Sequence, residues 1–250
     1  IRDLSLDWSS DVCSSDLRLP VIGFTLLVLA VTWLLYSEPH VRTYLCPACT
    51  GFREIAPRIY VDQKATDAEI DAALLSFAAG QRMVLDFYPD QASNPVWLLC
   101  LSGQCGVRNL PRPLAMAYVN WFVFAYPDGA NATIFAHELA HAELHHRVGS
   151  SRRFFSQAVP AWFDEGLSVY ISQDTRYLDV EDGEVTGCKA GDWPQPPSDQ
   201  RTFRRLGATQ SEEIYTASAC RVIEWLERHG GAEAVVAMLR ERRAGDVFRE

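Results

Sequence analysis

The feature that most constrains the fold is the segment His137-Glu138-Leu139-Ala140-His141. Residues four apart lie one above the other on an α-helix, with Cβ atoms roughly 5–6 Å apart. On such a helix the imidazoles of His137 and His141 can both reach one metal ion, at about 2.0–2.1 Å from each ring nitrogen. Glu138 then lies beside the first histidine, where its carboxylate can take a proton from a water at the metal. The spacing therefore predicts a helix that carries one Zn²⁺ per chain.

The residues around this segment favour a packed helix. Asn131 is a good N-cap residue, and Gly149 is a good residue to end a helix that runs to about Val148. One side of this stretch is apolar, at Ile134, Leu139, Ala140 and Leu144. The alternative is a helix whose histidines only pair with neighbouring acidic side chains.

A catalytic zinc usually has three protein ligands, so a third must be found. The metzincin extension fails, because Arg147 stands where its third histidine would be and Leu144 where it requires glycine. His145 is eight residues from His137, about 12 Å along a helix, and cannot share the ion. We expect His145 and His146 to be surface groups or to lie behind the ligands.

A carboxylate on the following helix is the remaining option for the third ligand. That helix is expected from about Pro160 to Ser172, and it carries Asp164 and Glu165 within an otherwise apolar sequence. Buried carboxylates are costly without a partner such as a cation. Gly166 has no side chain and would allow another helix to approach closely beside Glu165.

The segment HELAH, followed by WFDEGLSVY at residues 162–170, resembles the gluzincin metallopeptidases. The resemblance covers residues 131–172 closely and extends loosely to residues 211–231, which are similar to the helix after the site in peptidase-MA-like domains. It implies a zincin-like fold in which three residues bind the metal and Glu138 is the catalytic base. The implied ligands are His137, His141 and Glu165.

The same resemblance implies roles for a few further residues. Gluzincins often present substrate along an edge strand before the zinc helix, which residues 116–126 resemble. Many also use a tyrosine or histidine to stabilise the oxyanion, and Tyr215 is the best candidate, with Tyr170 second. Asp164 could orient a ligand imidazole. The alternatives are core packing for Tyr215 and a surface position for Asp164.

The order of the expected elements predicts an α+β fold with a small, mostly antiparallel sheet followed by a helical zinc-binding subdomain. A helix should open at Thr66, which forms a capping box with Glu69. Residues 174–201 are expected to be loop with one strand at 176–186. The strands are expected at residues 95–101 and 115–126, and the later helices at 131–148, 160–172, 211–229 and 232–243.

The N-terminal part divides into three predicted segments ahead of a metallopeptidase domain at residues 57–250. Residues 1–18 are expected to be a disordered or non-native tail. Residues 19–37 carry no charged side chain and would span about 28 Å as a helix, which predicts one transmembrane helix. A long signal peptide is the alternative, although no small-residue cleavage site follows. Residues 38–56 are expected to be a juxtamembrane linker.

With Cys13 set aside in the tail, the remaining cysteines favour disulfide bonds and a domain outside the cytoplasm. Zinc binding by the CPAC segment at residues 46–49 is an alternative, but a four-cysteine site needs a second CxxC. A thioredoxin-like role for that segment is a further alternative. These six cysteines are an even set with two close pairs, and their connectivity is left open: Cys46 and Cys49, Cys100 and Cys105, Cys188 and Cys220.

The net charge of -9 and the lack of a basic stripe argue against nucleic acid as a partner. The sequence as a whole predicts a membrane-tethered zinc metallopeptidase that faces outside the cytoplasm and cleaves a peptide or protein substrate. The alternative is a non-catalytic, zinc-bound binding or scaffold domain of the cell envelope. Protein partners are left open.

Overall fold

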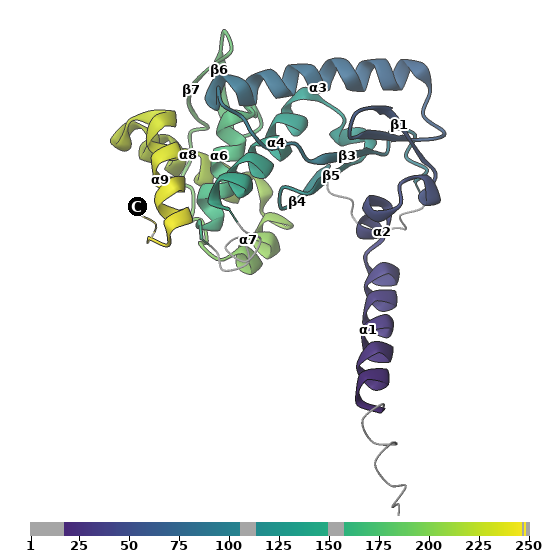
Figure 1. Cartoon of the computed structure of the whole chain (residues 1–250). Coiled ribbons are helices and arrows are strands. Elements are labelled where there is room, and N and C mark those ends of the chain that lie inside the picture. Colours follow the sequence, from purple (N-terminus) through teal and green to yellow (C-terminus); the bar gives the residue numbers. More distant parts are fainter. Residues whose placement is uncertain (1–17, 106–113, 150–157, 247, 249–250) are drawn as a thin grey trace, which may run out of the picture.

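The computed structural model describes residues 18–105, 114–149, 158–246 and 248. Within them the chain is α+β, as predicted, with a five-stranded sheet beside a group of helices contributed by its later part (Figure 1). The expected tail falls, apart from Arg18, outside the described residues.

The sheet is mixed, not mostly antiparallel as predicted. β3 pairs in parallel with both β2 and β5, whereas the edge strands β1 and β4 are antiparallel to their neighbours. A parallel pair needs a long crossover connection, and α3 (Asp67–Phe87) supplies the one between β2 and β3. The strand order is β1 (Phe52–Ala56), β2 (Ile59–Asp62), β3 (Val96–Leu99), β5 (Phe122–Ala125) and β4 (Ala115–Tyr118).

Both faces of the sheet are covered, which explains why its strands are apolar at successive positions. On one face, Trp97 contacts Phe77 of α3 and Phe135 of α4 (Ala132–Val148), with ring centroids 5.0 and 5.5 Å apart. On the other face, Leu98 and Phe124 belong to a second apolar cluster beneath α2 (Pro39–Leu45). Neighbouring residues of β3 therefore point into different layers.

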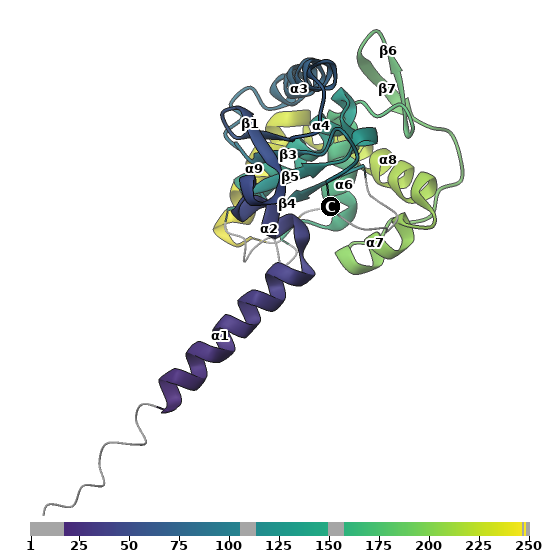
Figure 2. The ribbon, with the colours of Figure 1, turned by 90° about the vertical axis from the view of Figure 1, so that its right-hand side faces the viewer.

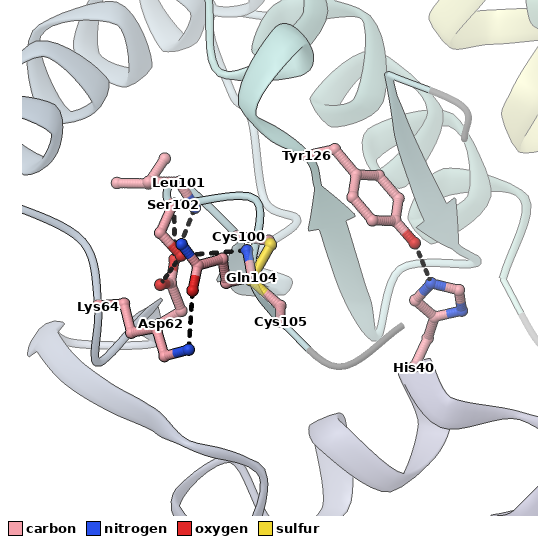
Figure 3. The surroundings of a disulfide bond; sticks show 9 residues. All are labelled: His40, Asp62, Lys64, Cys100, Leu101, Ser102, Gln104, Cys105 and Tyr126. Carbon is pink, nitrogen blue, oxygen red and sulfur yellow. Dashed lines mark hydrogen bonds between the residues drawn. A yellow bond between two sulfur atoms is a disulfide. The ribbon is translucent and has the colours of Figure 1, made fainter. Parts of the chain in front are cut away.

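α2 is fixed to the sheet by a buried histidine. The Nε2 of His40 lies 2.8 Å from the hydroxyl of Tyr126 (Figure 3), and its Nδ1 lies 3.0 Å from the hydroxyl of Tyr118. The 3-10 turn η1 (Ala48–Thr50) and β1 follow α2. Residues 38–56, expected to be a linker, thus contain a docked helix and an edge strand.

α3 begins with the predicted capping box. The side chain of Thr66 accepts from the backbone N–H of Glu69, and the Glu69 carboxylate accepts from the backbone N–H of Thr66. Farther along, Gly80 lets α3 approach α4, because a Cβ at this position would lie 2.6 Å from the carbonyl oxygen of Ala132.

The helices that hold the candidate site follow the predicted pattern closely. Asn131 caps α4 by accepting from the backbone N–H of Ile134 at 3.0 Å, and Gly149 ends that helix. α6 packs between α4 and α8, and α9 packs against α4. Their bounds are α6 Ala161–Ile171, α8 Ser211–His229 and α9 Gly231–Ala244.

The segment at residues 174–201 is more regular than the predicted loop with one strand. It contains a hairpin of β6 (Leu178–Glu181) and β7 (Glu184–Cys188), which rises above α8 in Figure 2. At its end, the side chain of Asp199 accepts from the backbone N–H of Thr202 and caps α7 (Gln200–Gly207).

The N-terminal helix differs from its prediction. α1 (Arg18–Ser37) projects away from the rest of the chain in both views (Figures 1 and 2). A membrane span needs about 20 predominantly apolar residues, and no helix within the described part of the chain is long and apolar enough to cross a bilayer. The prediction of a transmembrane helix at residues 19–37, and with it of a single-pass membrane protein, is therefore wrong.

The prediction that the cysteines form disulfide bonds is confirmed, and the structure supplies their connectivity, with Cα atoms 5.2–5.8 Å apart in each pair. Two of them close short loops, whereas Cys188–Cys220 joins residues 32 apart and ties the end of β7 to α8. Disulfides form and persist in oxidising environments, and this set fits an oxidising compartment. The pairs are Cys46–Cys49, Cys100–Cys105 and Cys188–Cys220.

Candidate metal centre

α4 and α6 bring the three predicted ligands together. The two Nε2 atoms of His137 and His141 lie 3.1 Å apart. One carboxylate oxygen of Glu165 lies 3.6 Å from the first and 3.4 Å from the second. Ligand atoms at about 2.0–2.1 Å from a tetrahedral zinc ion are about 3.3–3.4 Å apart. The three atoms therefore form a triangle of the size that one zinc ion requires.

The charges around this triangle favour a cation. Burial alone would lower the pKa of His141, but Asp164 and Glu165 outweigh burial and hold it well above its usual value. Burial alone would likewise raise the pKa of Glu165, yet the two histidines outweigh it and lower that pKa to about 2. About a tenth of each ligand side chain is exposed, so the site is sheltered but reachable.

The predicted close approach at Gly166 is confirmed. A Cβ on Gly166 would lie 2.4 Å from the carbonyl oxygen of Ser218 on α8, which is far inside van der Waals contact. Glycine therefore allows α6 and α8 to touch through their backbones. Because Glu165 is the preceding residue, this contact sets how far its carboxylate reaches toward α4.

Asp164 holds one of the imidazoles, as the sequence suggested. Its Oδ1 lies 2.7 Å from Nδ1 of His141. An ionised carboxylate can only accept, so Nδ1 carries a hydrogen and Nε2 is the nitrogen that faces the triangle. Burial alone would raise the pKa of Asp164, but His145 and His141 outweigh it and hold that pKa well below its usual range.

Glu138 is buried in the site without belonging to the ligand triangle. Burial raises the pKa of its carboxyl, and the neighbouring histidines His137 and His141 act in the opposite direction. Its carboxylate also accepts a hydrogen bond from the backbone of Ala117 on the edge strand β4. Glu138 thus lies between α4 and the sheet edge.

The two candidate tyrosines have different positions. The ring of Tyr215 lies 6.5 Å from that of His137, and the negative charge of Glu165 followed by burial raises the pKa of its hydroxyl well above the usual value. That hydroxyl is also hydrogen-bonded to Glu165. Tyr170 packs its ring against Phe87 of α3 instead. The structure therefore brings Tyr215 to the site.

His145 is closer to the site than its distance from His137 indicated. Its side chain is only 5% exposed, and its Nε2 lies 2.9 Å from Oδ2 of Asp164. The missed signal is its spacing from His141, one helical turn away on the same face. His146 lies farther out, with Nδ1 at 3.3 Å from the amide of Asn120.

The residue that excluded the metzincin pattern has a structural role. Arg147 binds the buried carboxylate of Glu143 and that of Asp90, each at 2.7 Å. Glu143 also accepts from the backbone N–H groups of Ala92 and Ser93. This pair fixes the loop after α3 to α4, on the helix that carries the candidate ligands.

A second group of potential metal ligands consists of Asp62, Cys100 and Cys105. The ligand atoms of this group are already engaged in other bonds. The carboxylate of Asp62 accepts from the backbone N–H groups of Leu101 and Ser102 (Figure 3), and the two cysteines form a disulfide. Asp62 and Cys105 border a cavity of about 490 Å³ that is also lined by residues of α2. The cavity is separate from the histidine cluster.

No protein-family model, curated protein or solved structure matches this chain. The support for a function therefore comes from the chain's own residues, above all from the two imidazoles and the carboxylate that converge between α4 and α6.

Proposed function

We propose that the chain is a zinc-dependent peptidase of the gluzincin type. His137, His141 and Glu165 would hold one Zn²⁺, and Glu138 would be the general base. The observation that carries the proposal is the triangle of two imidazole nitrogens and one carboxylate oxygen, with sides of 3.1, 3.4 and 3.6 Å. The buried carboxylate next to this triangle adds the group that hydrolysis needs.

The bound metal would supply Lewis acidity, which acidifies water and polarises a carbonyl oxygen. Glu138 would take the proton from the attacking water and deliver it to the nitrogen of the leaving amine. A general base works best when its pKa is close to the working pH. Burial moves the pKa of Glu138 in that direction.

Two further groups would act on the substrate. The hydroxyl of Tyr215 could donate a hydrogen bond to the oxyanion that forms from the peptide carbonyl. β4 is an edge strand, and an extended peptide can add to such an edge through main-chain hydrogen bonds. Glu138 contacts Ala117 on this strand, so a peptide bound there would run past the base.

The alternative is a non-catalytic zinc domain, which needs the three ligands but leaves the buried position of Glu138 without a purpose. Hydrolysis of an unfolded protein by the zinc-loaded chain distinguishes the two functions, with new amino termini as the readout. Wild type is compared with Glu138→Gln, and with Glu213→Gln as a control at an exposed position of α8.

We expect Glu138→Gln to keep one zinc per chain and to lose activity by a factor on the order of 10²–10⁴. The control should keep both. Full activity in Glu138→Gln would refute the role of the base. Failure of the zinc-loaded wild type to hydrolyse any peptide bond would favour the non-catalytic alternative.

A further inference from the structure

His145 connects the metal site to the turn of the sheet-edge hairpin. Its Nε2 lies 2.9 Å from Oδ2 of Asp164, and its Nδ1 lies 3.2 Å from the carbonyl oxygen of Val119. Asp164 uses its other oxygen on the ligand His141. One buried ring thus links the turn between β4 and β5 to a carboxylate that holds a zinc ligand.

The hydrogen-bonding groups on this path have fixed directions. A carbonyl oxygen and an ionised carboxylate accept but do not donate. The ring of His145 thus lies between two acceptors, the carbonyl of Val119 and the carboxylate of Asp164, and it cannot rotate without losing both contacts. The stacked rings of His141 and His145, with centroids 5.8 Å apart, place the two histidines along one face of α4.

The turn at the far end of the path has an unusual backbone. Val119 has φ +57° although it is β-branched, and its side chain is buried. Such residues seldom adopt this conformation unless their surroundings hold them there. The bond from His145 to the Val119 carbonyl is one such contact, and the next residue, Asn120, meets His146.

We infer that His145 is a positioning residue of the metal centre, acting on His141 through Asp164. This inference rests on the proposed zinc site. It also explains an asymmetry between the ligands, because Nδ1 of His137 is buried without a hydrogen-bond partner among the described residues. The ring of His141 is held by Asp164, and His145 in turn holds Asp164.

Two substitutions separate the two bonds of His145. The amide of Gln occupies the place of Nε2 and can still donate to Asp164, whereas the amide of Asn occupies the place of Nδ1 and can still donate to Val119. The affinity for Zn²⁺ of the full chain is measured by competition with a chelating dye, for wild type, His145→Asn and His145→Gln. The absorption spectrum of the Co²⁺-loaded chains reports the ligand geometry.

We expect His145→Asn to weaken zinc binding about 10–100-fold, the usual effect of losing a group that orients a metal ligand. Its Co²⁺ spectrum should change, while His145→Gln should bind zinc within about threefold of wild type and keep the spectrum. Wild-type affinity in His145→Asn, or weaker binding by His145→Gln than by His145→Asn, would overturn the inference.

Asp164→Asn provides a second test, of whether His145 acts through Asp164. If both residues act along one path, adding His145→Asn to Asp164→Asn should change zinc affinity little further, and full additivity would refute the path. If wild type itself binds no zinc, the proposed function fails. If wild type binds zinc and the His145 variants match it, only this inference fails.

Discussion

The imidazole of His141 has a different partner on each of its two nitrogens. Nδ1 is held by Asp164 at 2.7 Å, and Nε2 faces His137 and Glu165. Two imidazole lone pairs at 3.1 Å repel each other unless a proton or a cation lies between them. A metal ion would satisfy both rings and the carboxylate at once, which is why we propose these residues as zinc ligands.

Tyr215 lies beside these three residues and is the candidate for stabilising the oxyanion. We expect Tyr215→Phe to keep one zinc per chain and to lower kcat about 10²–10³-fold with little change in KM, since its hydroxyl would act mainly on the oxyanion. Tyr177→Phe is the matched control, because its ring stacks on Tyr215 at 5.4 Å. Steady-state kinetics on one peptide checks this prediction, which an unchanged kcat in Tyr215→Phe would contradict.

The sequence could predict which candidate ligands lie together but not all of their supporting contacts. His137 and His141 have a local spacing that one helix is enough to interpret, and Glu165 follows from the resemblance and from its apolar surroundings. His145 depends on Asp164, which lies 19 residues away on another helix. The packing of α6 against α4 brings His145 and Asp164 together, and no local sequence pattern predicts that packing.

At the scale of elements, the contact between α6 and α8 depends on Gly166. Gly166→Ala places a Cβ 2.4 Å from a carbonyl oxygen, so the helices must separate. We expect the free energy of unfolding to fall by about 1–3 kcal/mol, as measured by urea denaturation. Gly187→Ala, where a Cβ would meet nothing within 4 Å, should change it by no more than about 0.5 kcal/mol. Equal effects at the two glycines would contradict this account of the helix contact.

The docking of α2 should make stability depend on pH. Burial lowers the pKa of His40 below its usual 6.5, so the unfolded chain binds more protons at this position between the two pKa values. The contribution of His40 is therefore fully present above about pH 6.5 and is lost as the pH falls below it. The free-energy difference between wild type and His40→Gln should shrink from pH 7 to pH 5.

Urea denaturation of both metal-free proteins across this range measures that difference. Removing zinc from both keeps the titration of the metal ligands equal in the two proteins. A difference that stays constant with pH would show that His40 is not held neutral against the sheet.

The elements were predicted best where their signals are local. The caps at Thr66, Asn131 and Gly149 correctly located the ends of two helices. The parallel pairing of β3 could not be predicted from the strand residues, because the direction in which strands pair depends on the connections between them, such as the crossover through α3 from β2 to β3. α7 was missed because its polar sequence offered only the cap at Asp199 as a signal.

At the scale of the whole molecule, one disulfide closes a far longer loop than the other two. Cys188–Cys220 joins residues 32 apart, whereas Cys46–Cys49 joins residues 3 apart. Loop-closure entropy predicts that replacing the first pair by alanine lowers the free energy of unfolding by about 3–4 kcal/mol, against about 2 kcal/mol for the second. Urea denaturation of the two double variants under oxidising conditions measures both values. A larger loss for Cys46–Cys49 would contradict the prediction.

The N-terminal helix α1 shows that a run of uncharged residues can predict a helix without predicting a membrane span correctly. Residues 19–37 do form a helix, as their composition indicated. Their length and lack of charge predicted a membrane span, but no helix in the described part of the chain is long and apolar enough to cross a bilayer. The disulfides depend on separate evidence, and they still fit an oxidising compartment.

X-ray absorption at the zinc edge of the zinc-loaded chain identifies the atoms that bind the metal. The account predicts only nitrogen and oxygen neighbours at about 2.0–2.1 Å, with outer scattering from two imidazoles. Glu165→Ala should lower the zinc content while His137 and His141 remain. Sulfur neighbours at about 2.3 Å, or a zinc content and spectrum unchanged in Glu165→Ala, would contradict the assignment of these three residues to the metal.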